Sequence, residues 1–253
     1  MEIEIDLKKS AFENAADYFE RGKKLKKKLE GATEALRNAK FQHADASKEL
    51  KKEKEKKKKR KWYDAFRHFF TSEGMLVVAG KDARSNEELV KKHLEKGDIV
   101  FHADIIGAAF AVIKAQGKAA GDASLEEAAQ FAASYSRAWL RGLGAMDVYW
   151  VTPEQVTKHA PSGEYLGRGA FMIEGKKNYF HDVELALSFG ERDGALVWGP
   201  DKTVRRVCER AVTVKPGDVP AKELAAGIKK QVGVGEAGEI ERLIPYGKGS
   251  FRR

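Results

Sequence analysis

His102 and Asp104, in the segment FHADIIG, have the side-chain types and the spacing of a small chemical site. Residues two apart on a strand point to the same face of a sheet, so this imidazole and this carboxylate could bind a metal ion together or transfer a proton. A structural hydrogen bond explains the same pattern. No third ligand lies at a diagnostic spacing, and the glycines form neither a Walker A loop nor a dinucleotide fingerprint. The sequence therefore predicts no catalytic residue, no metal and no cofactor.

Basic residues beside turns and strand ends are the second group of candidates, because several such residues can converge on one surface. Lysine and arginine side chains pair with phosphate oxygens, and Tyr165 and Tyr179 would offer ring faces on which unpaired bases stack. Either tyrosine could instead belong to the core, with its hydroxyl bonded to a buried partner. The basic candidates are Lys81, Arg84, Lys114, Lys158, Arg168, Lys176 and Lys177.

Residues 150–180 combine several turn signals in one short run. Thr152 is a predicted N-cap followed by a proline and an acidic residue, and two glycine-rich turns follow it. Residues 170–173 fit a short buried strand, after which a turn directs Lys176 and Lys177 outward. This pattern predicts a rigid surface that recognises an anion. A hairpin with solvated lysines is the alternative.

The composition narrows the class of protein. The chain has 253 residues, 34% of them charged, and a formal net charge of +9, which favours phosphate-bearing partners. A single cysteine, Cys208, excludes an internal disulfide framework and fits a reducing compartment. No apolar run approaches the roughly 20 residues of a membrane span, and the N-terminus lacks the pattern of a signal peptide. We expect a soluble cytoplasmic protein without a membrane partner.

Residues 1–61 differ from the rest of the chain, because they contain no proline and are rich in lysine. Apolar residues recur near helical spacing on both sides of Gly31, which predicts two helices folded as an antiparallel coiled-coil hairpin. Residues 48–61 carry ten Lys and Arg against three Glu. This basic end could contact RNA phosphates, or it could be a solvated helix or linker.

Residues 62–253 are predicted to form a globular domain that begins with an aromatic cluster at Trp62. Many short strands with interspersed helices, without regular βαβ alternation, indicate an α+β fold with a mixed, largely antiparallel sheet. Ser85 and Glu88 predict a capped helix that ends near His93. Ser124 and Glu127 in the same way predict a longer helix over residues 125–140.

From Trp62 onward, three long motifs resemble the NFACT-R domain, the RNA-binding module of the NFACT family. The preceding IDLKKSAFENAADYFERGKKLKKKLEGATEAL is similar to the middle coiled coil of that family, and the ending PYGKGSFR is similar to archaeal members. The resemblance implies a non-enzymatic module that binds tRNA, ribosomal RNA or the large ribosomal subunit in quality control of stalled nascent chains. The three motifs are KWYDAFRHFFTSEGMLVVAGKDARSNEELVKKHL, GDIVFHADIIGAAFAVIKA and WVTPEQVTKHAPSGEYLGRGAFMIEGKKNYF.

This resemblance makes Lys176 and Lys177 the expected phosphate ligands. Ile106 and Ala109 stand where family members commonly have a second histidine and a serine, which weakens a phosphate or base contact from that loop. The sequence lacks an NFACT-N region, so we do not expect this chain alone to elongate C-terminal tails. The remaining expected RNA contacts are Lys81, Arg84, His102, Asp104, Lys158, Tyr165, Arg168 and Asn178.

Two other functions fit parts of the sequence. The first is an RNA-processing or RNA-modifying enzyme that uses His102 and Asp104, and a bound metal or an RNA product lost in His102→Ala would identify it. The second is a protein-docking adaptor in which the helical residues 1–61 make the essential contact. Neither the RNA that is bound nor the oligomeric state follows from the sequence.

Overall fold

The computed structural model describes residues 4–57, 61–158 and 166–252, and for residues 35 and 37–57 it describes the helical backbone alone. Contacts divide the chain into two units, Met1–Lys61 and Trp62–Arg253. No helix within the described ranges is long and apolar enough to cross a lipid bilayer.

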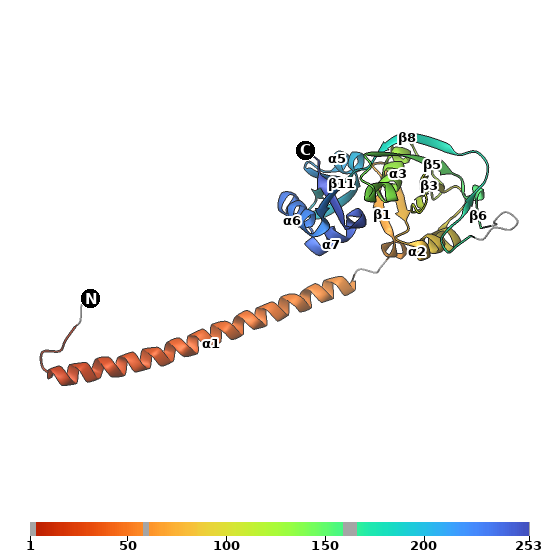
Figure 1. Cartoon of the computed structure of the whole chain (residues 1–253). Coiled ribbons are helices and arrows are strands. Elements are labelled where there is room, and N and C mark those ends of the chain that lie inside the picture. Colours follow the sequence, from red (N-terminus) through yellow and green to blue (C-terminus); the bar gives the residue numbers. More distant parts are fainter. Residues whose placement is uncertain (1–3, 58–60, 159–165, 253) are drawn as a thin grey trace. The chain divides into compact units, whose positions relative to one another are not determined.

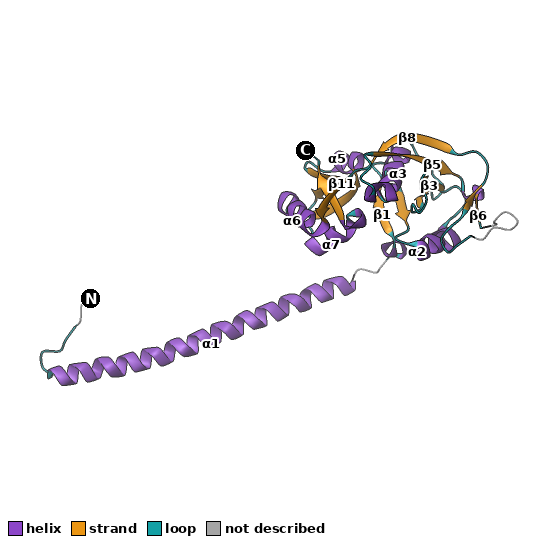
Figure 2. Cartoon of the chain, in the orientation of Figure 1, coloured by secondary structure: helices purple, strands orange, loops and turns teal. Residues whose placement is uncertain are grey.

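The first unit contains one continuous helix, α1 (Ala11–Lys57), which Figures 1 and 2 show as a single long element. A capping box fixes its start, because Ser10 Oγ accepts from the Glu13 N–H and the Glu13 carboxylate accepts from the Ser10 N–H. At about 1.5 Å per residue, the 47 residues of α1 extend about 70 Å.

This helix corrects the antiparallel hairpin expected for residues 1–61. The backbone stays helical through Gly31, where the turn was expected. A single glycine costs a helix only about 1 kcal/mol relative to alanine, and the neighbouring Leu29, Glu30 and Ala32 are adequate helix formers. The segment around Gly31 has no proline and no second glycine that would end the helix.

The second unit is built on a six-stranded sheet in which every pairing is antiparallel. Its strands β2 (Leu76–Ala79) and β4 (Ala111–Lys114) are buried at every residue and apolar except for Lys114 at the end of β4, which is the pattern of a strand covered on both faces. In order across the sheet the strands are β1 (Arg67–Phe70), β2 (Leu76–Ala79), β4 (Ala111–Lys114), β3 (Ile99–Ala103), β5 (Ala145–Val151) and β8 (Asn178–Glu184).

Alternate residues of these strands enter two separate apolar clusters. In β2, Val77 and Ala79 belong to the larger cluster, and Leu76 and Val78 belong to the smaller one. Helix α3 (Asp122–Ser134) covers the larger cluster with its many small residues, as the sequence predicts for a tightly packed helix. On the other face, η1 (Trp62–Ala65) precedes Phe66 of the smaller cluster, and a π-turn, η2 (Leu89–His93), supplies Leu89.

A second, four-stranded antiparallel sheet packs against the same larger cluster. The ring centres of its Trp198 and of Phe131 in α3 are 6.0 Å apart. Helix α6 (Ala221–Val232) packs Leu224 and Ile228 into the same cluster. The α+β class with antiparallel sheets and packed helices, predicted from the sequence, is confirmed. The strands of this sheet are β10 (Ala195–Pro200), β9 (Leu187–Arg192), β11 (Ala211–Pro220) and β12 (Lys248–Phe251). The remaining elements are α2 (Ala83–Glu88), α4 (Arg137–Leu140), η3 (Pro153–Gln155), β6 (Val156–Thr157), β7 (Met172–Ile173), α5 (Asp201–Val207), α7 (Ala237–Leu243) and η4 (Pro245–Gly247).

Two predicted helix boundaries change. Ser85 is the third residue of α2 and not its N-cap, because Asp82 caps the helix and exchanges hydrogen bonds with Ser85. The helix expected over residues 125–140 begins at Asp122 and stops at Ser134. The backbone then restarts as α4, where Ser136 Oγ accepts from the Ala138 N–H. The first difference follows from Asp82, which competes with Ser85 as the cap, and the early stop of α3 is followed by a new helix that Ser136 caps.

Candidate functional site

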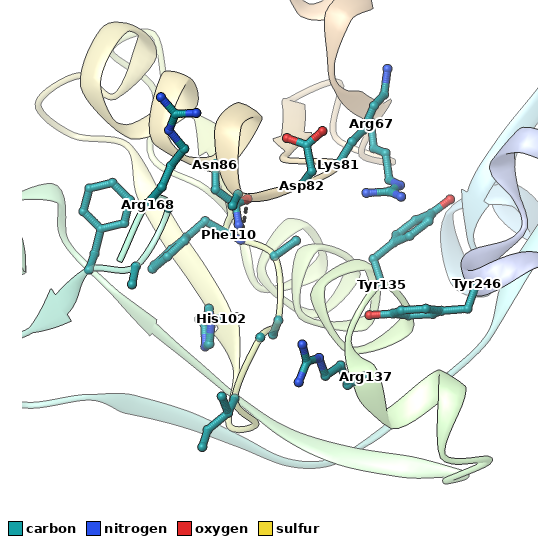
Figure 3. Close-up of a pocket in the computed structure, with 18 of the residues that line it drawn as sticks. Arg67, Lys81, Asp82, Asn86, His102, Phe110, Tyr135, Arg137, Arg168 and Tyr246 are labelled. Carbon is teal, nitrogen blue, oxygen red and sulfur yellow. Dashed lines mark hydrogen bonds between the residues drawn. The ribbon is translucent and has the colours of Figure 1, made fainter. Parts of the chain in front are cut away.

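A cavity of about 700 Å³ opens between the start of α2, the loop that follows β3, the loop before β7 and the C-terminal η4 (Figure 3). Four basic residues line it, against a single carboxylate among the described lining residues, Asp82. Aromatic rings complete the wall. The basic residues are Arg67, Lys81, Arg137 and Arg168, and the aromatic ones are Phe110, Tyr135, Tyr149, Phe171 and Tyr246.

Asp82 is engaged by its own helix. Its Oδ1 accepts from the Ser85 N–H at 2.8 Å and from the Ser85 hydroxyl at 2.9 Å. These hydrogen bonds hold the pKa of Asp82 below its usual range, so the carboxylate stays charged. Because it caps α2, this carboxylate compensates the basic residues only partly, and the cavity keeps an excess of positive charge.

Arg67 is held in place by contacts other than an ion pair, and its charge contributes to the lowered pKa of Asp82. Its Nη1 donates to the Gly80 carbonyl at 2.9 Å, and its guanidinium lies 4.6 Å from the centre of the Tyr135 ring. Tyr135 is itself fixed, since its hydroxyl donates to the Leu243 carbonyl at 2.6 Å. Burial together with the positive charge of Arg67 lowers the pKa of the nearby Lys81. Within the described ranges Arg67 and Arg137 form no ion pair.

Two glycines allow the walls of the cavity to approach each other. Gly107 has φ +81°, and a Cβ there would lie 2.7 Å from Arg137 Nε. Gly169 has φ +74°, and a Cβ there would lie 2.4 Å from the carbonyl oxygen of Ala83 in α2. The first glycine makes room for the Arg137 side chain, and the second seats the loop that carries Arg168 on the helix.

His102 lines the cavity, and Asp104 follows it two residues later. The His102 ring lies 4.9 Å from the Phe110 ring and 5.7 Å from the Tyr149 ring, and burial lowers its pKa. Asp104 lies beyond the end of β3, is exposed, and accepts a hydrogen bond from Tyr179. The shared face predicted for the two residues stays a prediction. The Asp104 N–H still donates to the Asp147 carbonyl of β5 at 2.8 Å, and the charge of Asp104 opposes the effect of burial on the pKa of His102. Among the residues that the structure describes, no three His, Cys, Asp or Glu side chains cluster as metal ligands do.

The expected phosphate ligands lie next to this cavity. The Lys177 ammonium is 4.2 Å from the centre of the Tyr149 ring, and Tyr149 lines the cavity. Lys176 is exposed, and its carbonyl accepts from Gln155 Nε2, which fixes the turn. Asn178 is half-buried in β8 and donates to the Trp150 carbonyl at 3.4 Å, which is a structural contact.

The other predicted basic residues have different surroundings. Lys158 lies 2.6 Å and Arg168 3.6 Å from the Glu87 carboxylate. Hydrogen bonds from Lys158 and Lys91 lower the pKa of Glu87 to about 2. The single Glu87 carboxylate therefore pairs with three cations, Lys91, Lys158 and Arg168, and the four side chains together keep a net positive charge. Arg84 is exposed on α2 outside the cavity lining, and Tyr165 lies outside the described residues.

Lys114 does not belong to any cationic surface. Its side chain is 4% exposed, and its ammonium lies 2.5 Å from Asp98 Oδ2 and 2.9 Å from Glu95 Oε2. It also donates to the His93 carbonyl. The expectation that it converges with the other basic residues is wrong, because this buried pair satisfies the charge inside the fold.

The cavity residues that are not predicted from the sequence include Arg67, Arg137 and Tyr246. They come from β1, α4 and η4, which are far apart along the chain. Tyr246 lies within the PYGKGSFR ending, whose only signal is its similarity to archaeal members of the NFACT family. No local signal in the sequence indicates that these residues meet.

Comparison with known proteins identifies the family. A family model described as "NFACT protein RNA binding domain" matches residues 65–175. The archaeal Rqc2 homolog aRqcH of Methanocaldococcus jannaschii is 45% identical over 195 residues, which cover 74% of this chain and 29% of that protein. This chain belongs to the NFACT family. The expected resemblance is confirmed.

Mammalian NFACT proteins are also similar. "Ribosome quality control complex subunit NEMF" of mouse is 35% identical over 91% of this chain and 22% of that protein. The human protein of the same name is 36% identical over 83% of this chain and 20% of that protein. The chain therefore spans less than a third of the length of each of these relatives.

The NFACT match contains the basic part of the cavity. Arg67, Lys81, Arg137 and Arg168 all lie within residues 65–175. Lys176 and Lys177 follow this range directly, and Tyr246 lies well beyond it. The C-terminal segment thus closes a cavity that the NFACT-R part of the chain begins.

Proposed function

We propose that residues 62–253 bind RNA through the surface around the cavity, as a module of ribosome-associated quality control. The observation that carries the proposal is the excess of cations: four basic side chains line the cavity with one carboxylate that already caps a helix. Clustered cations repel one another, and an anionic ligand relieves that repulsion. The energetically favourable occupant is a phosphate group.

RNA fits this surface better than an isolated phosphate does. Lys177 lies over Tyr149 at the edge of the cavity, so positive charge continues from the cavity to the turn at Lys176. Aromatic rings between the cations offer stacking faces, which RNA-binding surfaces use for unpaired bases. The relatives are named as subunits of ribosome quality control complexes. We infer that tRNA or ribosomal RNA of the large subunit is the partner.

The salt dependence of binding tests this proposal. Neutralisation of about five phosphates, one each by Arg67, Lys81, Arg137, Arg168 and Lys177, gives a slope of log affinity against log salt of roughly −3.5 to −4.5. Between 50 and 200 mM salt the affinity of the whole chain for tRNA or large-subunit rRNA should then fall roughly 130- to 500-fold. A filter-binding titration measures both values. Binding that is insensitive to salt, or no binding to either RNA, contradicts the proposal.

Paired variants locate the footprint. Lys176→Ala with Lys177→Ala should make the slope shallower by about one for each phosphate that these lysines neutralise, and should weaken binding to all RNA sequences alike. Lys202→Ala in α5 is the matched control, because this exposed lysine pairs with Glu126 and does not line the cavity. If the double variant binds RNA with unchanged affinity, the turn at Lys176 and Lys177 does not contact the RNA.

We propose that the site binds RNA without chemical conversion. His102 lies among aromatic rings, and burial lowers its pKa although the charge of Asp104 opposes this shift. Asp104 is exposed and has Tyr179 as a second partner, so we infer that the two residues serve the binding surface and not an acid–base step. The RNA recovered from the titrations should be unchanged on a denaturing gel and by mass. A product that forms with the wild-type chain and not with His102→Ala contradicts this part of the proposal.

A further inference from the structure

Tyr246 has a backbone conformation that needs an explanation. Its φ is +52°, and the other described non-glycine residues with positive φ are Gln116, Asp182 and Asp193. Aspartate tolerates this region through local hydrogen bonds, whereas a bulky aromatic residue pays about 1 kcal/mol or more for it. Such strain persists only where the surrounding structure imposes it, and it concentrates at binding sites.

Two buried side chains impose this conformation. The Tyr135 hydroxyl donates to the Leu243 carbonyl, and the Trp139 Nε1–H donates to the Lys248 carbonyl at 2.7 Å. These hydrogen bonds anchor the backbone on both sides of Tyr246. The ring is 44% exposed, lines the cavity and extends toward Arg137 in Figure 3. The fold thus holds an aromatic face in position at the wall of the cavity.

The same end of the cavity contains Arg67 and Arg137, neither of which forms an ion pair within the described residues. Burial raises the pKa of Tyr246, and the positive charges of Arg137 and Arg67 act against that rise, so both guanidinium groups lie within electrostatic range of its hydroxyl. Arg67 is fixed by the Gly80 carbonyl and by the Tyr135 ring. A guanidinium fork matches phosphate geometry, and a fixed fork loses less entropy when it binds.

We propose that this end of the cavity takes one unpaired nucleotide of the bound RNA, with its phosphate on Arg67 and Arg137 and its base against the ring of Tyr246. The inference rests on the proposed RNA-binding function and names the part of the RNA that enters the cavity. A base inside a duplex has both faces covered by its neighbours, so only a base outside the stack can lie against this ring. The volume of about 700 Å³ is within the usual range for a site that encloses a small ligand.

The exposed side chain of Ile106 supports an unpaired nucleotide over a duplex backbone. Ile106 is 87% exposed on the loop that carries Gly107 and lines the cavity. An exposed aliphatic side chain beside a cluster of cations offers nothing to phosphates but can contact a sugar or the face of a base. Apolar and aromatic side chains thus line the cavity together with the cations, and an unpaired strand presents both bases and phosphates.

Two RNA hairpins that differ in a single bulged nucleotide test the proposal. The wild-type chain should bind the bulged hairpin roughly five- to a hundredfold more tightly than the fully paired one, measured by fluorescence anisotropy at one salt concentration. Failure to bind either hairpin, or the tRNA and rRNA above, contradicts the RNA-binding function itself. Equal binding to both hairpins contradicts the nucleotide site and leaves the RNA-binding function standing.

Variants of Tyr246 separate the ring from the backbone. Tyr246→Asn removes the ring and keeps a residue that tolerates positive φ, so it should abolish the preference while affinity for the paired hairpin is kept. Tyr246→Phe keeps the ring and should keep the preference. A preference that survives in Tyr246→Asn contradicts the assignment.

Arg137→Gln tests the phosphate half of the proposal and does not depend on the backbone of Tyr246. It should weaken binding to the bulged hairpin by a larger factor than binding to the paired one. Equal losses for the two hairpins would place Arg137 on the general phosphate surface and would overturn its role in the nucleotide site. Circular dichroism melting of each variant shows that the fold is intact before its affinity is compared.

Discussion

Replacement of Gly169 by alanine tests how the cavity is built. Gly169 follows Arg168 in the loop that closes one wall, with φ +74°. A Cβ at this position would lie 2.4 Å from the Ala83 carbonyl oxygen and 2.7 Å from the Ala83 Cα. Both atoms belong to the backbone of α2, which cannot move aside as a flexible side chain can. The loop must therefore leave the helix, and Arg168 moves with it.

The cost of Gly169→Ala has two parts. An alanine in the left-handed region costs about 1–2 kcal/mol on conformation alone. The contact with Ala83 adds to this cost unless the loop detaches, so we expect the free energy of unfolding of residues 62–253 to fall by at least about 1–2 kcal/mol. For a unit of this size the melting temperature should fall by roughly 2–8 °C. RNA affinity should fall as well, because Arg168 leaves the cavity.

Gly167→Ala is the matched control in the same loop. A Cβ on Gly167 would meet no atom within 4 Å, and its φ is outside the positive range. Alanine should be neutral there or should stabilise slightly, by up to about 1 kcal/mol, because it restricts the unfolded chain. Urea unfolding measures the stability of both variants, and RNA titration measures their affinity. Equal stability and affinity of the two variants would refute the close approach of this loop to α2.

Two further predictions concern charged side chains outside the cavity lining. Lys114→Met should lower the free energy of unfolding by about 3–5 kcal/mol, because it leaves Asp98 buried without its cation, whereas Lys92→Met at an exposed pair should change it by less than about 1 kcal/mol. RNA affinity of the folded Lys114 variant should not change, and a specific loss would return this lysine to the RNA surface. The Glu87 pKa is lowered from 4.5 to about 2, so its contribution to stability is present above pH 4.5 and is lost as the pH falls toward 2. Glu87→Gln should therefore show a shallower decline in urea midpoint across that range, and an unchanged decline would contradict the lowered pKa.

The sequence was sufficient for elements whose signals are local. Continuous apolar runs predict β2 and β4, and both lie in the covered centre of the six-stranded sheet. Capping residues predict that helices begin near Ser85 and Ser124, although Asp82 and Gly121 are the actual caps. The predicted helix starts are only a few residues from the observed ones, because several neighbouring residues can act as the cap. Tertiary contacts then decide which of them does.

The single helix α1 shows where a local signal misleads. The apolar spacing changes at Gly31, and a hairpin explains that change as well as a continuous helix does. One glycine is a weak helix breaker, so helix propensity favours continuity while the amphipathic pattern favours a turn. Pattern alone does not decide between them, because a coiled-coil hairpin is stabilised by contacts between its two helices and not by the residues of its turn.

The candidate site was only partly predictable, because its residues come from elements far apart along the chain and differ in whether a buried partner neutralises them. Position beside turns selected Lys81 and Arg168, which line the cavity, and it also selected Lys114, which Asp98 neutralises inside the fold. Arg67 and Arg137 look ordinary in the sequence and have no ion pair within the described residues. A basic residue with a buried partner stabilises the fold, whereas one without a partner is available to a ligand. That difference depends on long-range contacts, and it makes the two arginines the residues on which the proposed function most depends.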